Sequence, residues 1–182
     1  MIIAFDGCER TGKTTQIKML KDYLQKKGYV VKSFHTSLLA GHDVTKMIIP
    51  ENSKLFAYIA ALEGITYALL CLPVVWKKKP CVWLLDRYIF SHQVYCERYY
   101  PKDFKTINQQ YFTSVINRLK KTGHVFTTIC LLKPYIKDKS YDTELMKLFE
   151  NMSIPGAEII KVHNSDLSKI QLHESIKEAV KL

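Results

Sequence analysis

A glycine-rich loop close to the first residue constrains this chain more than any other feature. Residues 7–14 read Gly-Cys-Glu-Arg-Thr-Gly-Lys-Thr, the pattern G-x-x-x-x-G-K-T. An apolar, strand-like run (residues 1–5) precedes them and a helical pattern (residues 15–20) follows. In that setting the glycines let backbone N–H groups turn toward phosphate oxygens, and the helix N-terminus adds its positive end. We therefore expect this segment, the P-loop, to bind a nucleoside triphosphate rather than to be a chance match in a turn.

Two side chains of the P-loop have the chemistry of a triphosphate site. Lys13 is placed to reach the β- and γ-phosphates, and the hydroxyl of Thr14 is placed to bind Mg²⁺. The cofactor we expect is accordingly Mg²⁺ together with ATP. The expected nucleotide contacts are Gly7, Arg10, Thr11, Gly12, Lys13, Thr14 and Thr15.

A second motif, Asp86-Arg87-Tyr88, follows the continuous apolar run of residues 81–85. Open α/β sheets bind ligands at the carboxyl ends of their strands, so this motif and the P-loop can face one cleft. Asp86 is our candidate for holding Mg²⁺ with Thr14; the alternative is a carboxylate that caps the next helix. Arg87 can clamp an acceptor phosphate or stabilise transferred charge, or form a surface ion pair of little value.

Strand-like and helix-like runs alternate along the whole chain. We expect strands near residues 1–5, 29–34, 81–85, 125–132 and 158–162. Helical patterns cover residues 15–27, 44–49, 55–76, 90–100, 104–121, the second part of 137–152, and 167–182. This alternation predicts an α/β fold with a parallel sheet of about five strands, covered by helices on both faces. Without an internal repeat or linker, residues 1–182 are expected to form a single domain.

Residues 55–76 form the most apolar stretch of the chain. A membrane span is not expected, because Glu63 lies in mid-run and Pro73 ends it. A buried or dimer-forming helix explains the stretch better. We therefore predict a homodimer through this helix.

The net charge of +10 invites a nucleic-acid interpretation, but the make-up of that charge argues against one. Only four of the 27 basic residues are arginines, and the lysines occupy surface-type helix positions without interleaved aromatic residues. The five cysteines are scattered without metal-ligand spacing, which indicates reduced thiols. No secretory signal is recognisable, so we expect a cytoplasmic protein with neither a nucleic-acid nor a membrane partner.

Residues 5–16 and 86–95 together resemble the thymidylate kinase family. The first segment, F-D-G-C-E-R-T-G-K-T-T-Q, is similar to that family's P-loop, F/I-E-G-x-D/E-x-x-G-K-S/T-T-Q. The second begins D-R-Y-I-F-S and has Tyr95 after it, and resembles D-R-Y-x-x-S-x-x-A-Y. The resemblance implies a P-loop NTPase fold and transfer of the γ-phosphoryl group of ATP to a deoxynucleoside monophosphate, with dTMP converted to dTDP as the expected reaction.

The resemblance also implies roles for individual residues. Lys13, Arg10, Arg87 and Asp86 would be the catalytic set, because phosphoryl transfer needs positioning and charge stabilisation more than covalent help. Glu9 would contact the acceptor's sugar. Arg10 would supply the transition-state charge, as in the eukaryote- and virus-like type of the family; its alternative is a solvent-facing loop residue. A short lid around residues 133–142 holds lysines but no arginine.

Two features of the family are absent here. Residues 34–38 lack the arginine that usually contacts the acceptor phosphate, and residues 55–63 lack the arginine that reads thymine. Phe56 remains to stack on the base, with Tyr58 as an alternative, and Ser91 and Tyr95 are candidates for base-edge or sugar contacts. Because losing a group that hydrogen-bonds a base changes discrimination strongly, the accepted base stays open.

Two other functions are compatible with these residues. A deoxynucleoside kinase would phosphorylate a bare hydroxyl and would need a carboxylate base, for which Glu9 or Asp6 could serve. A non-catalytic P-loop domain acting as a structural or partner subunit is the third possibility, kept open by the missing acceptor arginines. The compact, lysine-rich chain would also fit a viral protein in a host cytoplasm.

Overall fold

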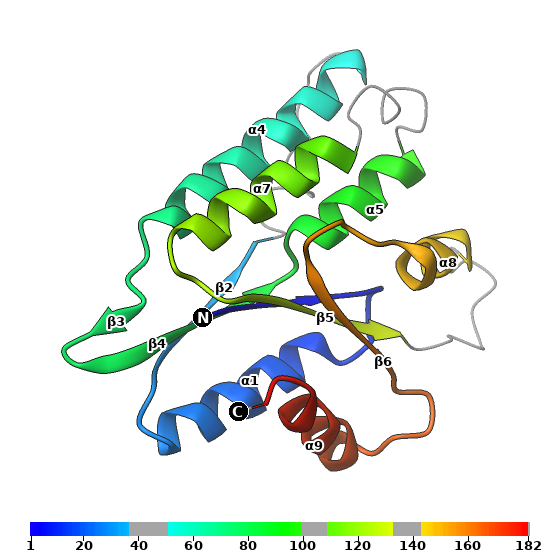
Figure 1. The fold of residues 1–182 in the computed structure, drawn as a ribbon. Coiled ribbons are helices and arrows are strands. Elements are labelled where there is room, and N and C mark those ends of the chain that lie inside the picture. The colour runs from blue at the N-terminus through cyan, green and yellow to red at the C-terminus, as the bar shows by residue number, and fades with distance from the viewer. Residues whose placement is uncertain (37–50, 100–108, 133–142, 182) are drawn as a thin grey trace.

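The computed structural model describes residues 1–36, 51–99, 109–132 and 143–181. Its centre is a sheet of five parallel strands in the order β2-β4-β1-β5-β6, as the alternation predicts (Figure 1). A sixth, short strand β3 (Val75–Trp76) pairs antiparallel with the start of β4. The bounds of the parallel strands are β1 (Ile2–Asp6), β2 (Val30–His35), β4 (Lys79–Asp86), β5 (Phe126–Leu132) and β6 (Glu158–His163).

Helices cover both faces of the sheet (Figure 1). One face carries α1 (Lys13–Lys26) and α9 (Lys169–Ala179); the other carries α4 (Glu51–Leu70), α5 (Ile89–Tyr99), α7 (Gln109–Lys121) and α8 (Thr143–Asn151). Successive residues of β1 therefore enter different cores: Ile2 and Ala4 pack under α4, α5 and α7, while Ile3 and Phe5 pack under α1 and α9. Burial on both faces explains why the central strands are continuously apolar.

The apolar run of residues 55–76 is only partly helical, so the predicted helix was wrong beyond residue 70. α4 ends at Leu70, and the chain then turns into β3. Pro73 cannot donate the backbone hydrogen bond that a continuing helix needs. Lys77 and Lys78 adopt left-handed φ angles of 48° and 63°, which closes a tight hairpin that pairs Trp76 with Lys79.

The remaining helices lie close to their predicted ranges. α9 begins at Lys169 because Ser168 and Gln171 form a capping box. The predicted helix at residues 44–49, the first part of the one at 104–121, and the lid at 133–142 lie outside the described residues. Within the described part of the chain, every helix is too short or too polar to cross a bilayer.

Candidate active site

The P-loop joins the end of β1 to the start of α1, and two of its glycines are required by the backbone. Gly7 has a φ of 123° and Gly12 a φ of 91°, both in the region that side chains disfavour. A Cβ on Gly7 would also lie 2.3 Å from the carbonyl oxygen of Leu131 on β5. The loop thus packs directly on the neighbouring strand.

Lys13 lies inside the curve of the P-loop and is buried there. Its Nζ donates to the carbonyl oxygens of Gly7 (3.1 Å) and Cys8, and to the hydroxyl of Thr11 (3.3 Å). Burial, reinforced by the nearby charge of Arg87, lowers the pKa of Lys13 to about 8. The ammonium is therefore a cation that a phosphate would stabilise.

The two sequence motifs meet through a direct hydrogen bond. The hydroxyl of Thr14 donates to Oδ2 of Asp86 at 2.9 Å, although the residues are 72 positions apart. His35, at the end of β2, places Nε2 3.8 Å from the same carboxylate oxygen. A hydroxyl and a carboxylate oxygen held together in this way are the type of ligand that Mg²⁺ takes from proteins.

Arg87 faces the P-loop from the strand next to β1. Its backbone N–H donates to the Phe5 carbonyl at 2.9 Å, and Nη1 donates to the Gly7 carbonyl at 3.0 Å and to the Tyr95 hydroxyl at 2.8 Å. The guanidinium also lies over the Tyr95 ring, 5.4 Å from its centroid. Both Arg87 and the exposed Arg10 have left-handed backbones, with φ angles of 68° and 56°.

Comparison with known proteins decides the family. The family model of thymidylate kinase matches residues 5–114, more than half of the chain and a segment that contains both motifs. The chain belongs to the thymidylate kinase family. It is accordingly a nucleoside monophosphate kinase, and its membership implies the use of ATP.

Solved structures agree with this fold over nearly the whole chain. The thymidylate kinase of Candida albicans is 16% identical, with a TM-score of 0.59, and the match covers 99% of this chain and 90% of that one. The thymidylate kinase of Ehrlichia chaffeensis is 17% identical, with a TM-score of 0.60 and coverage of 100% and 98%. The YorR protein of Bacillus subtilis, solved with phosphorylated GDP, is 14% identical, with a TM-score of 0.60 and coverage of 100% and 96%. At these identities the structural matches show the fold.

Within this thymidylate kinase fold, Asp6 is a buried residue whose role the sequence did not reveal. Its Oδ1 accepts the backbone N–H groups of Tyr88 (3.1 Å) and Ser91 (3.0 Å) and also the Ser91 hydroxyl. The last residue of β1 therefore caps the N-terminus of α5 and fixes the turn that carries Arg87. Burial raises the pKa of Asp6, while these hydrogen bonds oppose the rise.

Two further residues hold the site and were not predicted from the sequence, because their partners are distant along the chain. Asn164, just after β6, donates Nδ2 to the Thr11 carbonyl at 2.7 Å, and its backbone N–H donates to the Leu132 carbonyl at 2.9 Å. Thr36, just after β2, donates its hydroxyl to the carbonyls of Asp86 (3.0 Å) and Arg87. Polar residues directly after a strand were the available signal, because the carboxyl ends of parallel strands meet.

The structure brings three of the four catalytic candidates, Lys13, Asp86 and Arg87, together with Thr14. Lys13, Thr14, Asp86 and Arg87 form one hydrogen-bonded group with the P-loop and Tyr95. Glu9, Arg10 and Thr15 are exposed around it. Ser91, a predicted substrate contact, is buried, and its hydroxyl donates a hydrogen bond to Asp6 within the fold. Phe56 and Tyr58 lie on α4, but their side chains are outside the described residues.

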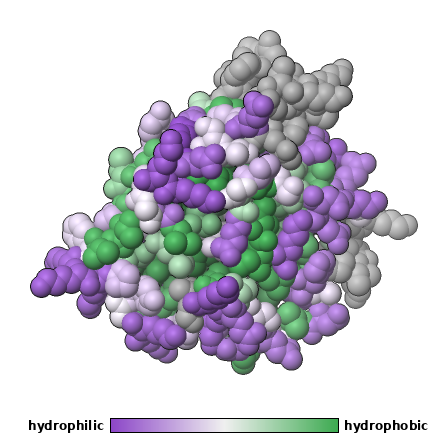
Figure 2. All heavy atoms as spheres, in the orientation of Figure 1, coloured by the Kyte–Doolittle hydropathy of each residue, from purple (hydrophilic) through white to green (hydrophobic). Residues whose placement is uncertain are grey.

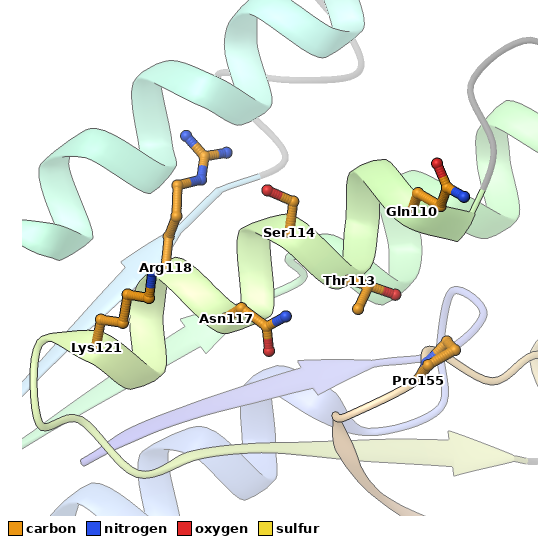
Figure 3. A pocket seen from close by; sticks show the side chains of 7 residues that line it. All are labelled: Gln110, Thr113, Ser114, Asn117, Arg118, Lys121 and Pro155. Carbon is orange, nitrogen blue, oxygen red and sulfur yellow. The ribbon is translucent and has the colours of Figure 1, made fainter.

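A groove of about 550 Å³ lies apart from the P-loop, between α7 and Pro155 (Figure 3). Thr113 and Asn117 face Pro155, whereas Arg118 turns toward α4. There its guanidinium donates to both carboxylate oxygens of Glu63, at 2.9 and 2.7 Å. This ion pair joins two helices and is not part of the phosphate site.

Proposed function

We propose that this kinase transfers the γ-phosphoryl group of ATP to dTMP, yielding dTDP. The observation that carries the proposal is the bond between Thr14 and Asp86 beside an Arg87 that contacts Gly7. These contacts join the P-loop to the Asp86-Arg87-Tyr88 motif, which supports donor and acceptor phosphates bound side by side. A phosphate acceptor arrives deprotonated, so the protein has to bring two polyanions together, a task suited to a lysine and two arginines.

Thr14 and Asp86 would hold the Mg²⁺ ion of the nucleotide. Among the described residues, no cluster of three or more His, Cys, Asp or Glu side chains could bind a metal without help. That suits Mg²⁺, which keeps waters and phosphate oxygens and takes one or two protein ligands. When bound, the ion would neutralise charge on the β- and γ-phosphates.

The remaining charges divide between donor and acceptor. Lys13 would hold the donor phosphates, since its ammonium lies in the loop that encloses them. Arg87 would clamp the acceptor phosphate, with Tyr95 orienting its guanidinium through a 2.8 Å hydrogen bond. Arg10 would stabilise the transferred charge, as in the eukaryote- and virus-like type of the family, and Glu9 would contact the acceptor's sugar.

The residues expected at the base site are compatible with thymine and with other bases. Phe56 or Tyr58 would stack on the base, and neither is followed by an arginine that reads its edge. The thymidylate kinase of Candida albicans, which shares this fold, has a broad substrate specificity. We propose that this enzyme is similarly tolerant, with dTMP as its principal acceptor.

The deoxynucleoside kinase alternative is less well supported. Its carboxylate base would have to be Glu9, because Asp6 is fully buried and its Oδ1 caps α5. A non-catalytic role is also disfavoured, since Lys13, Thr14 and Asp86 are all present and mutually placed.

The exposed face of α4 supports the homodimer. In the part of α4 whose side chains the structure describes, from residue 59 onward, the exposed positions are uncharged and mostly small: Ala60, Gly64, Tyr67, Ala68 and Cys71 just beyond the helix. A second copy of this helix could pack closely on such a face.

One experiment tests the activity. The protein is incubated with ATP, Mg²⁺ and a panel of deoxynucleosides and their monophosphates, and the products are separated by chromatography. We expect dTDP from dTMP and smaller amounts of other diphosphates. Monophosphates formed from nucleosides would favour the deoxynucleoside kinase, and ATP binding without any product would favour the non-catalytic domain.

A further inference from the structure

The edge of the sheet opposite the P-loop is rich in exposed lysines. All five long strands are parallel, so their starting residues lie along one edge. α1 and α7 also end there, as does the β3–β4 hairpin (Figure 1). We call this the basic edge; its exposed lysines are Lys26, Lys27, Lys77, Lys78, Lys79, Lys120 and Lys121. Glu158, which begins β6, is an acidic residue on the same edge, and it accepts the hydroxyl of Thr127 at 2.7 Å.

Large apolar side chains are exposed among these lysines. Val75 and Trp76 of β3 are 57% and 54% exposed, Val74 before them is 37% exposed, and Val125 before β5 is 57% exposed. In Figure 2, hydrophobic atoms gather on the side of the molecule where Figure 1 places β3, and hydrophilic atoms form the projecting tip beyond them. Exposed apolar side chains that are surrounded by polar groups indicate an interaction surface.

The exposed hairpin is anchored to the sheet. The indole N–H of Trp83 donates to the Pro73 carbonyl at 3.0 Å, and the backbone N–H of Cys81 donates to the Val74 carbonyl at 2.8 Å. The ring nitrogen Nε2 of His124 lies 2.9 Å from the carbonyl oxygen of Leu72. These bonds fix the backbone just before Val75 and Trp76, so their outward placement is part of the fold.

We propose that the basic edge docks on the surface of an anionic lipid bilayer. Trp76, Val75 and Val74 enter the interface between headgroups and acyl chains, and the flanking lysines contact the anionic headgroups. Tryptophan favours that depth because its ring is apolar and its N–H is polar. Clustered lysines add electrostatic attraction that accumulates with each residue near the surface.

A bilayer fits this edge better than a nucleic acid does. A phosphodiester backbone would satisfy the lysines, but it would leave two valines and a tryptophan without an apolar partner. Arginine, the better fork for a phosphodiester, is scarce here: Arg118 in the last turn of α7 is held by Glu63. A surface that is anionic outside and apolar within explains the lysines and the exposed apolar side chains together.

Docking in this way leaves the active site accessible. The P-loop, Asp86 and Arg87 lie at the carboxyl ends of the strands, so they would face away from the bilayer. The contact is peripheral and shallow, which differs from the membrane span that the sequence argued against. The proposal departs from the sequence-based expectation of no membrane partner.

Sedimentation with phosphatidylcholine vesicles, with and without phosphatidylserine, tests the electrostatic part. We expect binding that requires phosphatidylserine, weakens with added salt, and falls at least tenfold in the triple variant Lys77→Gln, Lys78→Gln, Lys79→Gln. A matched triple variant removes the same charge elsewhere, at Lys18, Lys147 and Lys169, and should bind within about twofold of the wild type. Equal loss in both variants, or binding that ignores phosphatidylserine, would overturn the proposal.

Tryptophan quenching by lipids brominated in the acyl chain tests the apolar part on the unmodified protein. Trp76 and Trp83 are the two tryptophans, and Trp83 is buried at 8% exposure. We expect quenching in the wild type and little in Trp76→Ser, whose remaining indole lies in the core. Absence of quenching in the wild type would mean that Trp76 faces another kind of partner. Tighter binding to duplex DNA than to the vesicles, unaffected by Trp76→Ser, would equally refute the lipid assignment.

Discussion

Replacing Gly7 by alanine should destabilise the protein far more than the same change at Gly12 or Gly123. All three glycines have positive φ angles, of 123°, 91° and 78°. A Cβ at Gly12 or Gly123 would meet nothing within 4 Å, whereas at Gly7 it would lie 2.3 Å from the Leu131 carbonyl oxygen. The three variants therefore separate backbone strain from a steric overlap.

The magnitudes follow from these geometries. A left-handed alanine at Gly12 or Gly123 should cost about 1–2 kcal/mol of unfolding free energy. At Gly7 the backbone strain is about 1–3 kcal/mol, and a contact of at least 3.0 Å requires the loop or β5 to move by roughly 0.7 Å. Overpacking of that kind adds about 1–3 kcal/mol. For a chain of this length, a total near 4 kcal/mol corresponds to a lowering of Tm by about 10 °C.

Urea denaturation measures the stabilities, and calorimetric titration measures ATP affinity. Gly7→Ala and Gly12→Ala should both weaken ATP binding, because each alters the P-loop, while Gly123→Ala should leave it unchanged. If Gly7→Ala were no more destabilising than Gly12→Ala, the close approach of the loop to β5 would be wrong. A loss of ATP affinity in Gly123→Ala would show that strain anywhere in the fold reaches the site.

Four other perturbations have defined outcomes. Arg10→Gly should lower turnover at least tenfold in the coupled kinase assay while raising Tm, because glycine relieves the left-handed backbone. Asn164→Asp should raise the KM for ATP severalfold more than the KM for dTMP, because a carboxylate oxygen would face the Thr11 carbonyl. Burial lowers the pKa of His92 to about 4, so its contribution to stability is complete above the unfolded pKa near 6.5 and is lost as the pH falls toward 4; His92→Gln should flatten urea-measured stability over that window. Gly64→Glu, where a Cβ meets nothing in the subunit, should convert a dimer to a monomer in light scattering.

Each of these has a result that contradicts it. Unchanged turnover in Arg10→Gly would remove its catalytic role, and equal changes in both KM values for Asn164→Asp would make that residue merely structural. A pH dependence of stability that persists in His92→Gln would assign it to other groups, such as His124 and His173, whose pKa values burial also lowers. A wild type that is already monomeric would refute the dimer.

The sequence predicted those parts of the fold and site that depend on local chemistry. The P-loop and the Asp86-Arg87 motif each follow an apolar, strand-like run, so the neighbouring sequence was enough to predict their positions. The contacts of Asn164 with Thr11 and of Asp6 with Tyr88 span 153 and 82 residues, and each arises only when strand ends are brought together. The strand β3 was missed because its two residues, Val75 and Trp76, end the apolar run that was predicted as a helix.

The two arginines proposed to act on phosphate share an unfavourable backbone. Arg10 and Arg87 both have left-handed φ angles, a conformation that costs a non-glycine residue about 1–2 kcal/mol. For Arg87 the cost is offset by bonds from its backbone to Phe5 and from its guanidinium to Gly7 and Tyr95. Glycine at either position would fold more easily but would carry no charge. At Lys77 and Lys78 the hairpin turn requires the left-handed backbone, whereas at Arg10 and Arg87 we expect the strain to be retained for the charge that each side chain brings to the proposed phosphate site.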